Sequence, residues 1–76
     1  MVKIILSGWK EGFEKVSLTM LQKEKLGMPL KDAKKNVDDL LDNKSIELLI
    51  KDKAVAVEFY NKLEQIGVIG KLIANY

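Results

Sequence analysis

The chain has 76 residues, a net charge of +2 and 47% hydrophobic residues, values that fit one small globular domain with a thin core. It contains neither cysteine nor histidine, which excludes disulfides, thiolate chemistry and the commonest general bases and transition-metal ligands. No apolar run approaches the roughly 18 residues of a membrane span, and the first apolar stretch is too short for a secretory leader. We therefore expect a cytoplasmic protein that uses no cofactor or metal and is not an enzyme.

Lysine accounts for all thirteen cations and is concentrated in the first half of the chain. Residues 1–35 hold eight lysines and four acids, a balance of +4, whereas residues 36–76 hold five lysines and seven acids, a balance of −2. Arginine, the residue that makes bidentate contacts to phosphate and guanine, is absent. We therefore do not expect sequence-specific binding of nucleic acid.

The first element is a strand over residues 2–6, a β-branched apolar run that ends at Ser7 and Gly8. Two glycines within residues 8–12 predict a loop. A helix follows from residue 13, and Gly27 supplies the left-handed cap that ends it. Its apolar positions are Phe13, Val16, Leu18, Met20, Leu21 and Leu26, with Lys15, Gln22 and Lys23 on its other faces.

Pro29 suits the first turn of a second helix, which carries an apolar stripe as far as residue 41. Residues 45–50 alternate apolar and polar side chains and predict a second strand. Asp52 can cap a third helix that ends before Gly67. Residues 68–73 form the last strand, and we expect residues 74–76 to fray. The helical core positions are Leu30, Ala33, Val37, Leu40 and Leu41 on the second helix, and Ala56, Phe59, Tyr60, Leu63 and Ile66 on the third.

The element order β-α-α-β-α-β predicts an α+β fold, a two-layer sandwich in which helices cover one face of a three-stranded antiparallel sheet. A length of 76 residues is enough for one domain and no more, so we expect residues 1–76 to form a single domain. Three strands with helices on one face are close to the minimum for independent stability.

Residues 15–37 combine a Lys-Val pair that opens a helix with a Gly-x-x-Leu-Lys-x-Ala-Lys-x-x-Val run. The residues of this pattern are Lys15, Val16, Gly27, Leu30, Lys31, Ala33, Lys34 and Val37. On these residues the chain resembles the C-terminal domain of the bacterial ribosomal stalk protein, which recruits translational GTPases. The element order of the whole chain agrees with that family. The resemblance implies a non-catalytic protein-interaction module.

In the stalk family the first two helices contact elongation and initiation factors. Transferred by position, this implies partner-binding roles for Val16, Lys23, Lys31 and Lys34. Lys23 stands where the family has arginine, Thr19 where it has an aliphatic residue, Met20 where it has lysine and Pro29 where it has glycine. The family's protein also has an N-terminal dimerisation module and a hinge, and we expect this chain to be free-standing without them.

Two alternatives use the same fold differently. A free-standing small regulator or inhibitor, encoded by a phage or mobile element, would bind an unrelated protein. The element order is also similar to that of the Clp protease adaptor for N-terminal degradation signals. That adaptor's Asn-Asp-Asp stretch and pocket histidine have no counterpart in this chain.

The lysines of the first two helices are the first candidate site. Lys31 and Lys34 lie one turn apart, so they share a helix face. The set also includes Lys15, Lys23 and Lys35. Such lysines suit either a solvated face or a patch that steers an acidic protein partner. Trp9, the single tryptophan, either caps the edge of the core or anchors an interface.

The outer face of the sheet is the second candidate site. Alternation along the strands places four aliphatic residues opposite the helices: Ile5, Leu49, Ile69 and Ile73. Lys3, Glu47 and Lys71 share that face. Four aliphatic side chains are more than a solvated sheet face needs. We therefore hypothesise a homodimer, or docking of a partner, through this face.

Overall fold

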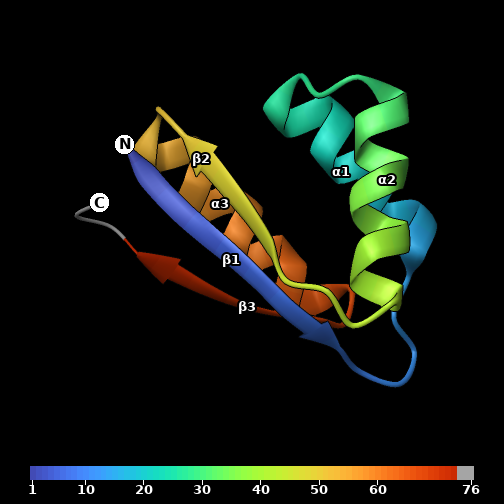
Figure 1. The fold of residues 1–76 in the computed structure, drawn as a ribbon. Helices are drawn as coiled ribbons and strands as arrows, with labels where there is room; N and C mark the ends of the chain where they lie inside the picture. Colours follow the sequence, from blue (N-terminus) through green and yellow to red (C-terminus); the bar gives the residue numbers. More distant parts are fainter. Residues whose placement is uncertain (74–76) are drawn as a thin grey trace.

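The computed structural model describes residues 1–73, which form three strands and three helices. The elements in chain order are β1 (Val2–Trp9), α1 (Lys15–Leu26), α2 (Leu30–Leu41), β2 (Ile46–Ile50), α3 (Lys53–Gln65) and β3 (Val68–Ile73). β1 lies in the middle of an antiparallel sheet with strand order β2-β1-β3. Figure 1 shows α3 running behind the sheet, with α1 and α2 paired beside it. The predicted α+β fold is confirmed; the fraying expected of residues 74–76 lies outside the described residues.

The core lies between one face of the sheet and the helices. α3 contacts all three strands, whereas α2 contacts β1 and β2. The most deeply buried large apolar side chains come from both layers: Ile4, Leu6, Leu18, Leu40, Phe59 and Leu63. Full burial of one such side chain contributes about 1.5–3 kcal/mol relative to exposure. Packing of this cluster therefore stabilises the two-layer arrangement.

The first strand is longer than the sequence predicts. It continues to Trp9, three residues beyond the predicted end at residue 6, because Gly8 and Trp9 pair with β3. The register shifts between Leu6 and Gly8, which places Ser7 in a β-bulge. The loop predicted for residues 8–12 is therefore wrong at its first two positions. The extension depends on pairing with a strand that is distant in the sequence. The Ser7 hydroxyl, for example, donates a hydrogen bond to the carbonyl of Ile69, 62 residues further along the chain.

Helix α1 begins two residues later than predicted, at Lys15, with Glu14 as the N-cap residue. Its predicted apolar stripe is wrong at two positions, because Val16 is 69% exposed and Met20 is 37% exposed. The buried side of α1 instead carries the polar residues Thr19 and Gln22 together with Leu18. On α2, Leu30 was also expected in the core and is 42% exposed.

The remaining boundaries agree closely with the predicted ones. β2 begins one residue after the predicted start, at Ile46. Asp52 caps α3 as predicted, since its Oδ1 accepts hydrogen bonds from the backbone amides of Ala54 (2.8 Å) and Val55 (3.3 Å). Gly67 follows α3 with φ +85°, and a Cβ there would lie 3.0 Å from the Phe13 Cα. This close approach connects the start of β3 to the segment that enters α1.

Candidate functional site

A tight reversal of the chain pairs α1 with α2. Gly27 has φ +65°, the left-handed conformation that ends a helix, and its amide donates to the Gln22 carbonyl. The Met28 amide donates to the same carbonyl at 3.4 Å. Pro29 is extended (φ −57°, ψ 144°) and directs the chain into α2 at Leu30. The two helices therefore pack against each other, as the glycine between the two apolar patterns predicts.

A fully buried amide joins the two helices. Gln22 has no exposed surface. Its Nε2 donates to the carbonyl oxygens of Leu18 (3.3 Å) and Ala33 (3.1 Å), and its Oε1 accepts from Asn36 Nδ2 at 2.8 Å. Buried polar groups are costly unless they are paired, and this one is paired on both atoms. The network therefore fixes how α1 and α2 lie against each other.

The exposed side of this helix pair carries a shallow groove of about 210 Å³. Its lining residues come from both helices: Lys15, Val16, Thr19, Lys34, Val37 and Asp38. Val16 and Lys34, which lie eighteen positions apart in the sequence, thus meet at one groove. The fold brings together two of the residues that the stalk resemblance implicates.

The five lysines of the first candidate site all point to solvent. Lys15, Lys23, Lys31, Lys34 and Lys35 are each exposed. Lys35 Nζ forms an ion pair with Asp39 Oδ2 at 3.0 Å. Exposed ion pairs of this kind contribute little to stability, so this pair adds little to the stability of α2.

Helical periodicity adds three more residues to this surface. Lys23 lies two turns beyond Val16 on α1, and Leu30 lies one turn before Lys34 on α2. Lys31 is three positions from Lys34. We call the surface made by Lys15, Val16, Lys23, Leu30, Lys31 and Lys34 the hairpin face. It combines exposed aliphatic side chains with an excess of positive charge.

Trp9 does not belong to the hairpin face. It lies at the end of β1 and is 41% exposed, and its ring centroid is 6.1 Å from that of Phe13 at a tilt of 34°. It is not among the residues that line the α1–α2 groove. Trp9 therefore lies against Phe13 at the end of β1, outside the groove that Lys15 and Lys34 line.

The outer face of the sheet lies opposite the helices, as alternation predicts. Leu49, Ile69 and Ile73 are 56%, 43% and 37% exposed, while Ile5 on the central strand is partly buried. We call Ile5, Leu49, Ile69 and Ile73, together with Lys3, Glu47 and Lys71, the sheet face. Lys3 Nζ lies 3.2 Å from Glu47 Oε1 on this face.

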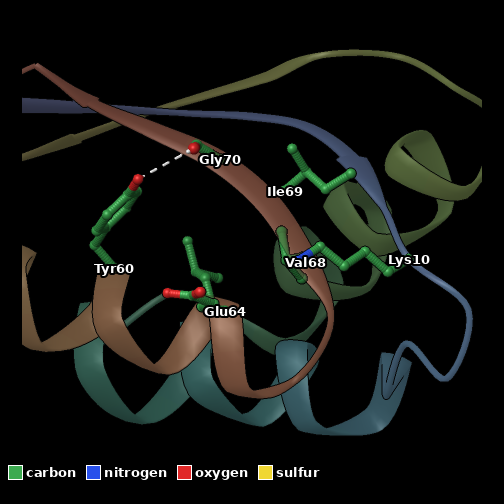
Figure 2. Close-up of a pocket in the computed structure, with 7 residues that line it drawn as sticks. Lys10, Tyr60, Glu64, Val68, Ile69 and Gly70 are labelled. Carbon is green, nitrogen blue, oxygen red and sulfur yellow. Dashed lines mark hydrogen bonds between the residues drawn. The ribbon is translucent and has the colours of Figure 1, made fainter.

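A second hollow lies between α3 and β3 (Figure 2). It has a volume of about 210 Å³, and Lys10, Glu64, Val68 and Ile69 are among its lining residues. Tyr60 closes one side, where its hydroxyl donates to the Gly70 carbonyl at 3.2 Å. The chain has no histidine or cysteine to place here, and this hollow offers one carboxylate rather than a carboxylate pair. No motif in the sequence predicts this hollow.

One titratable group within the described residues has a clearly shifted pKa. A hydrogen bond and the positive charge of Lys25 hold the pKa of the Glu58 carboxyl below its ordinary value, with a smaller contribution from Lys62. This ion pair joins α1 to α3. Residues 1–73 contain no cluster of acidic side chains that could hold a metal ion. Nor does this part of the chain contain a helix of the length and hydrophobicity that spanning a bilayer requires.

The chain was also compared with known proteins. No protein-family model matches it, and no curated protein is significantly similar to it.

Proposed function

We propose that this domain is a non-catalytic protein-interaction module that acts in the cytoplasm and binds its partner through the hairpin face. The observation that carries the proposal is the exposure of Val16, an aliphatic side chain 69% accessible beside the groove that Lys34 also lines. An exposed aliphatic group in a groove lined by two lysines and one aspartate is suited to a partner with an apolar contact inside a mainly acidic surface. The absence of histidine and cysteine favours binding over catalysis.

The partner class follows from the resemblance to the ribosomal stalk domain. That resemblance favours translational GTPases, because the matching helices in the family contact elongation and initiation factors. The chain keeps Val16, Lys31 and Lys34 at the matching positions and has Lys23 in place of arginine. We therefore propose translational GTPases as the partners, with steering by the lysines.

Capture from a bacterial lysate by the immobilised chain tests this proposal. We expect translational GTPases to be recovered, and the combined variant Lys31→Glu/Lys34→Glu to reduce their recovery at least about tenfold. The matched control is Lys51→Glu/Lys53→Glu, which changes the net charge equally at exposed residues outside the hairpin face. Recovery should also fall as salt rises, since exposed charges are screened.

Other outcomes would overturn parts of this proposal. Recovery of one unrelated protein in place of the GTPases would favour a free-standing regulator that reuses the fold. Equal loss of binding in the control variant would show that net charge, and not the hairpin face, governs the contact. Binding that both variants leave intact would contradict the hairpin face as the contact surface.

We propose the sheet face as a second surface, used for self-association. It exposes Leu49, Ile69 and Ile73 on the side of the sheet that no helix covers within the described residues. Clustered apolar side chains on such a face are typical of association sites.

A further inference from the structure

We infer that two copies of this chain stack through their sheet faces about a two-fold axis that runs along β1. The inference rests on the proposed self-association and specifies its geometry. The register of the strands sets the charges on this face. Ile5 is paired with Glu47 on one side and with Lys71 on the other, so a carboxylate and an ammonium group flank the central aliphatic residue.

The neighbouring row of the sheet face has the reverse arrangement. Lys3 is central, and it is paired with Leu49 on β2 and with Ile73 on β3. The Ile5 row therefore has opposite charges on its β2 and β3 sides, whereas the Lys3 row has an aliphatic residue on both sides. This difference decides which symmetric stacking is favourable.

A two-fold axis along β1, midway between the stacked sheets, places β2 of one copy over β3 of the other. Ile5 then meets Ile5 of the second copy, and Leu49 meets Ile73 twice. Glu47 faces Lys71 of the second copy, also twice. An axis across the strands at the level of the Ile5 row would instead place Glu47 over Glu47 and Lys71 over Lys71, which is repulsive. An axis across the strands midway between the two rows would place Glu47 over Leu49 and Lys71 over Ile73, which leaves these charges without an opposite charge. The two opposite-charge pairs therefore favour the axis along β1.

Lys3 is the one residue that this axis places opposite a like charge. Its Nζ is held 3.2 Å from Glu47 Oε1 of its own chain, toward β2. The two β2 strands lie on opposite sides of the axis, so the two ammonium groups point away from each other. Aligned sheets also pack about 10 Å apart with strands about 30° from parallel, which an axis close to β1 satisfies.

The size of the sheet face implies weak association. With strands about 4.8 Å apart and about 3.3 Å per residue, three strands of five residues cover a flat area of about 240 Å². A standard interface buries roughly 800 Å² of accessible surface on each partner. We therefore expect dimers to appear between high micromolar and millimolar concentrations.

Sedimentation equilibrium of the intact chain with charge-reversal variants tests the inference. Glu47→Lys or Lys71→Glu alone makes both inter-copy pairs like-charged, so each should weaken dimerisation at least about tenfold. The double variant Glu47→Lys/Lys71→Glu exchanges the two signs and should recover most of the wild-type affinity. An equimolar mixture of the two single variants should also recover it, because one heterodimer again contains two opposite-charge pairs.

Matched controls separate this geometry from a net-charge effect. Glu24→Lys and Lys53→Glu make the same changes in net charge at exposed helical positions. They should leave the dissociation constant within about twofold of wild type. Circular dichroism of every variant would establish that each is folded.

Three results would overturn the inference. They are a wild-type chain that stays monomeric at millimolar concentration, a double variant no stronger than the single ones, and controls that weaken dimerisation as much as the sheet-face reversals. Failure here is distinguishable from failure of the proposed partner binding, because capture through the hairpin face uses different residues. Sheet-face variants should leave that capture unchanged.

Discussion

The replacement Gln22→Glu tests whether the buried amide holds α1 against α2. Glutamate matches glutamine in size, so the variant creates no cavity. Its second carboxylate oxygen would take the place of Nε2, which lies 3.3 Å from the Leu18 carbonyl oxygen and 3.1 Å from that of Ala33. Two hydrogen bonds would thus become two contacts between acceptors unless the carboxyl takes up a proton.

At neutral pH the introduced carboxyl must either take up a proton or remain charged and buried, and both destabilise the fold. Protonation of a glutamate with an ordinary pKa of about 4.3 costs about 1.36 kcal/mol per pH unit, or about 3.7 kcal/mol at pH 7. A protonated carboxyl donates only one hydrogen bond, and the lost one costs about 1 kcal/mol. Leaving the carboxylate charged and buried costs several kcal/mol as well. We expect the free energy of unfolding to fall by about 3–5 kcal/mol, out of roughly 4–11 kcal/mol for a chain of this length.

The pH dependence has a definite sign. Burial raises the pKa of the introduced carboxyl in the folded state above its unfolded value. The destabilisation is therefore greatest above the folded-state pKa and shrinks as the pH falls toward about 4.3, the unfolded value. Below that pH only the lost hydrogen bond, about 1 kcal/mol, remains.

Urea unfolding followed by the fluorescence of Trp9 provides the assay, with wild type and variant compared at pH 7 and pH 4.5. Gln22→Met is the control, because it removes the hydrogen bonds without adding a titratable group. Its stability difference from wild type should be about 1–2 kcal/mol and should not change with pH. A Gln22→Glu variant that is equally destabilised at both pH values, or not destabilised, would refute the role given to this amide.

Three further predictions concern two helix ends and the carboxyl of Glu58. Asp52→Ala removes the side-chain cap of α3 and should lower the free energy of unfolding by about 1 kcal/mol in urea titrations, whereas retained stability would mean that the cap contributes nothing. Gly67→Ala should lower the melting temperature more than Gly27→Ala. Both positions have positive φ, which costs an alanine about 1–2 kcal/mol, but only at Gly67 would the added Cβ press against backbone. Equal shifts in thermal melting would contradict this. Lys25→Met should return the pKa of Glu58 upward toward its ordinary value in an NMR titration, and an unchanged titration would show that this lysine does not cause the shift.

Most of the fold could be predicted from local sequence signals. Asp52 and Gly27 mark helix ends through their own side-chain or backbone preferences, which do not depend on distant residues. The alternation in β2 likewise gave the correct buried face, because one face of the sheet is covered. These signals suffice for the order of elements and for the placement of the sheet face.

The errors occur where distant contacts decide the outcome. The extension of β1 to Trp9 depends on pairing with β3, at the other end of the chain. The burial of Gln22 depends on the acceptor and donor that α2 supplies at Ala33 and Asn36. One sequence signal could have indicated the burial of Gln22: it lies four residues from both Leu18 and Leu26 and so shares their helix face.

The hairpin face also combines residues that the sequence identified with residues that it assigned to the core. Its lysines were identified from the sequence, and the structure leaves all of them exposed. Helical spacing placed Val16 and Leu30 among the core positions, while the stalk resemblance gave Val16 a partner-binding role; both side chains are exposed beside those lysines. An apolar count alone does not distinguish core residues from contact residues, because both recur at helical spacing.

Binding of a translational GTPase through the hairpin face can be tested by NMR mapping of the isotope-labelled chain during titration with the purified GTPase. We expect amide signals of the hairpin face, above all those of Val16 and Lys34, to shift on binding while those of the sheet face do not. Shifts confined to the sheet face or to the hollow beside Tyr60, or no shifts at concentrations where the GTPase is in excess, would contradict it.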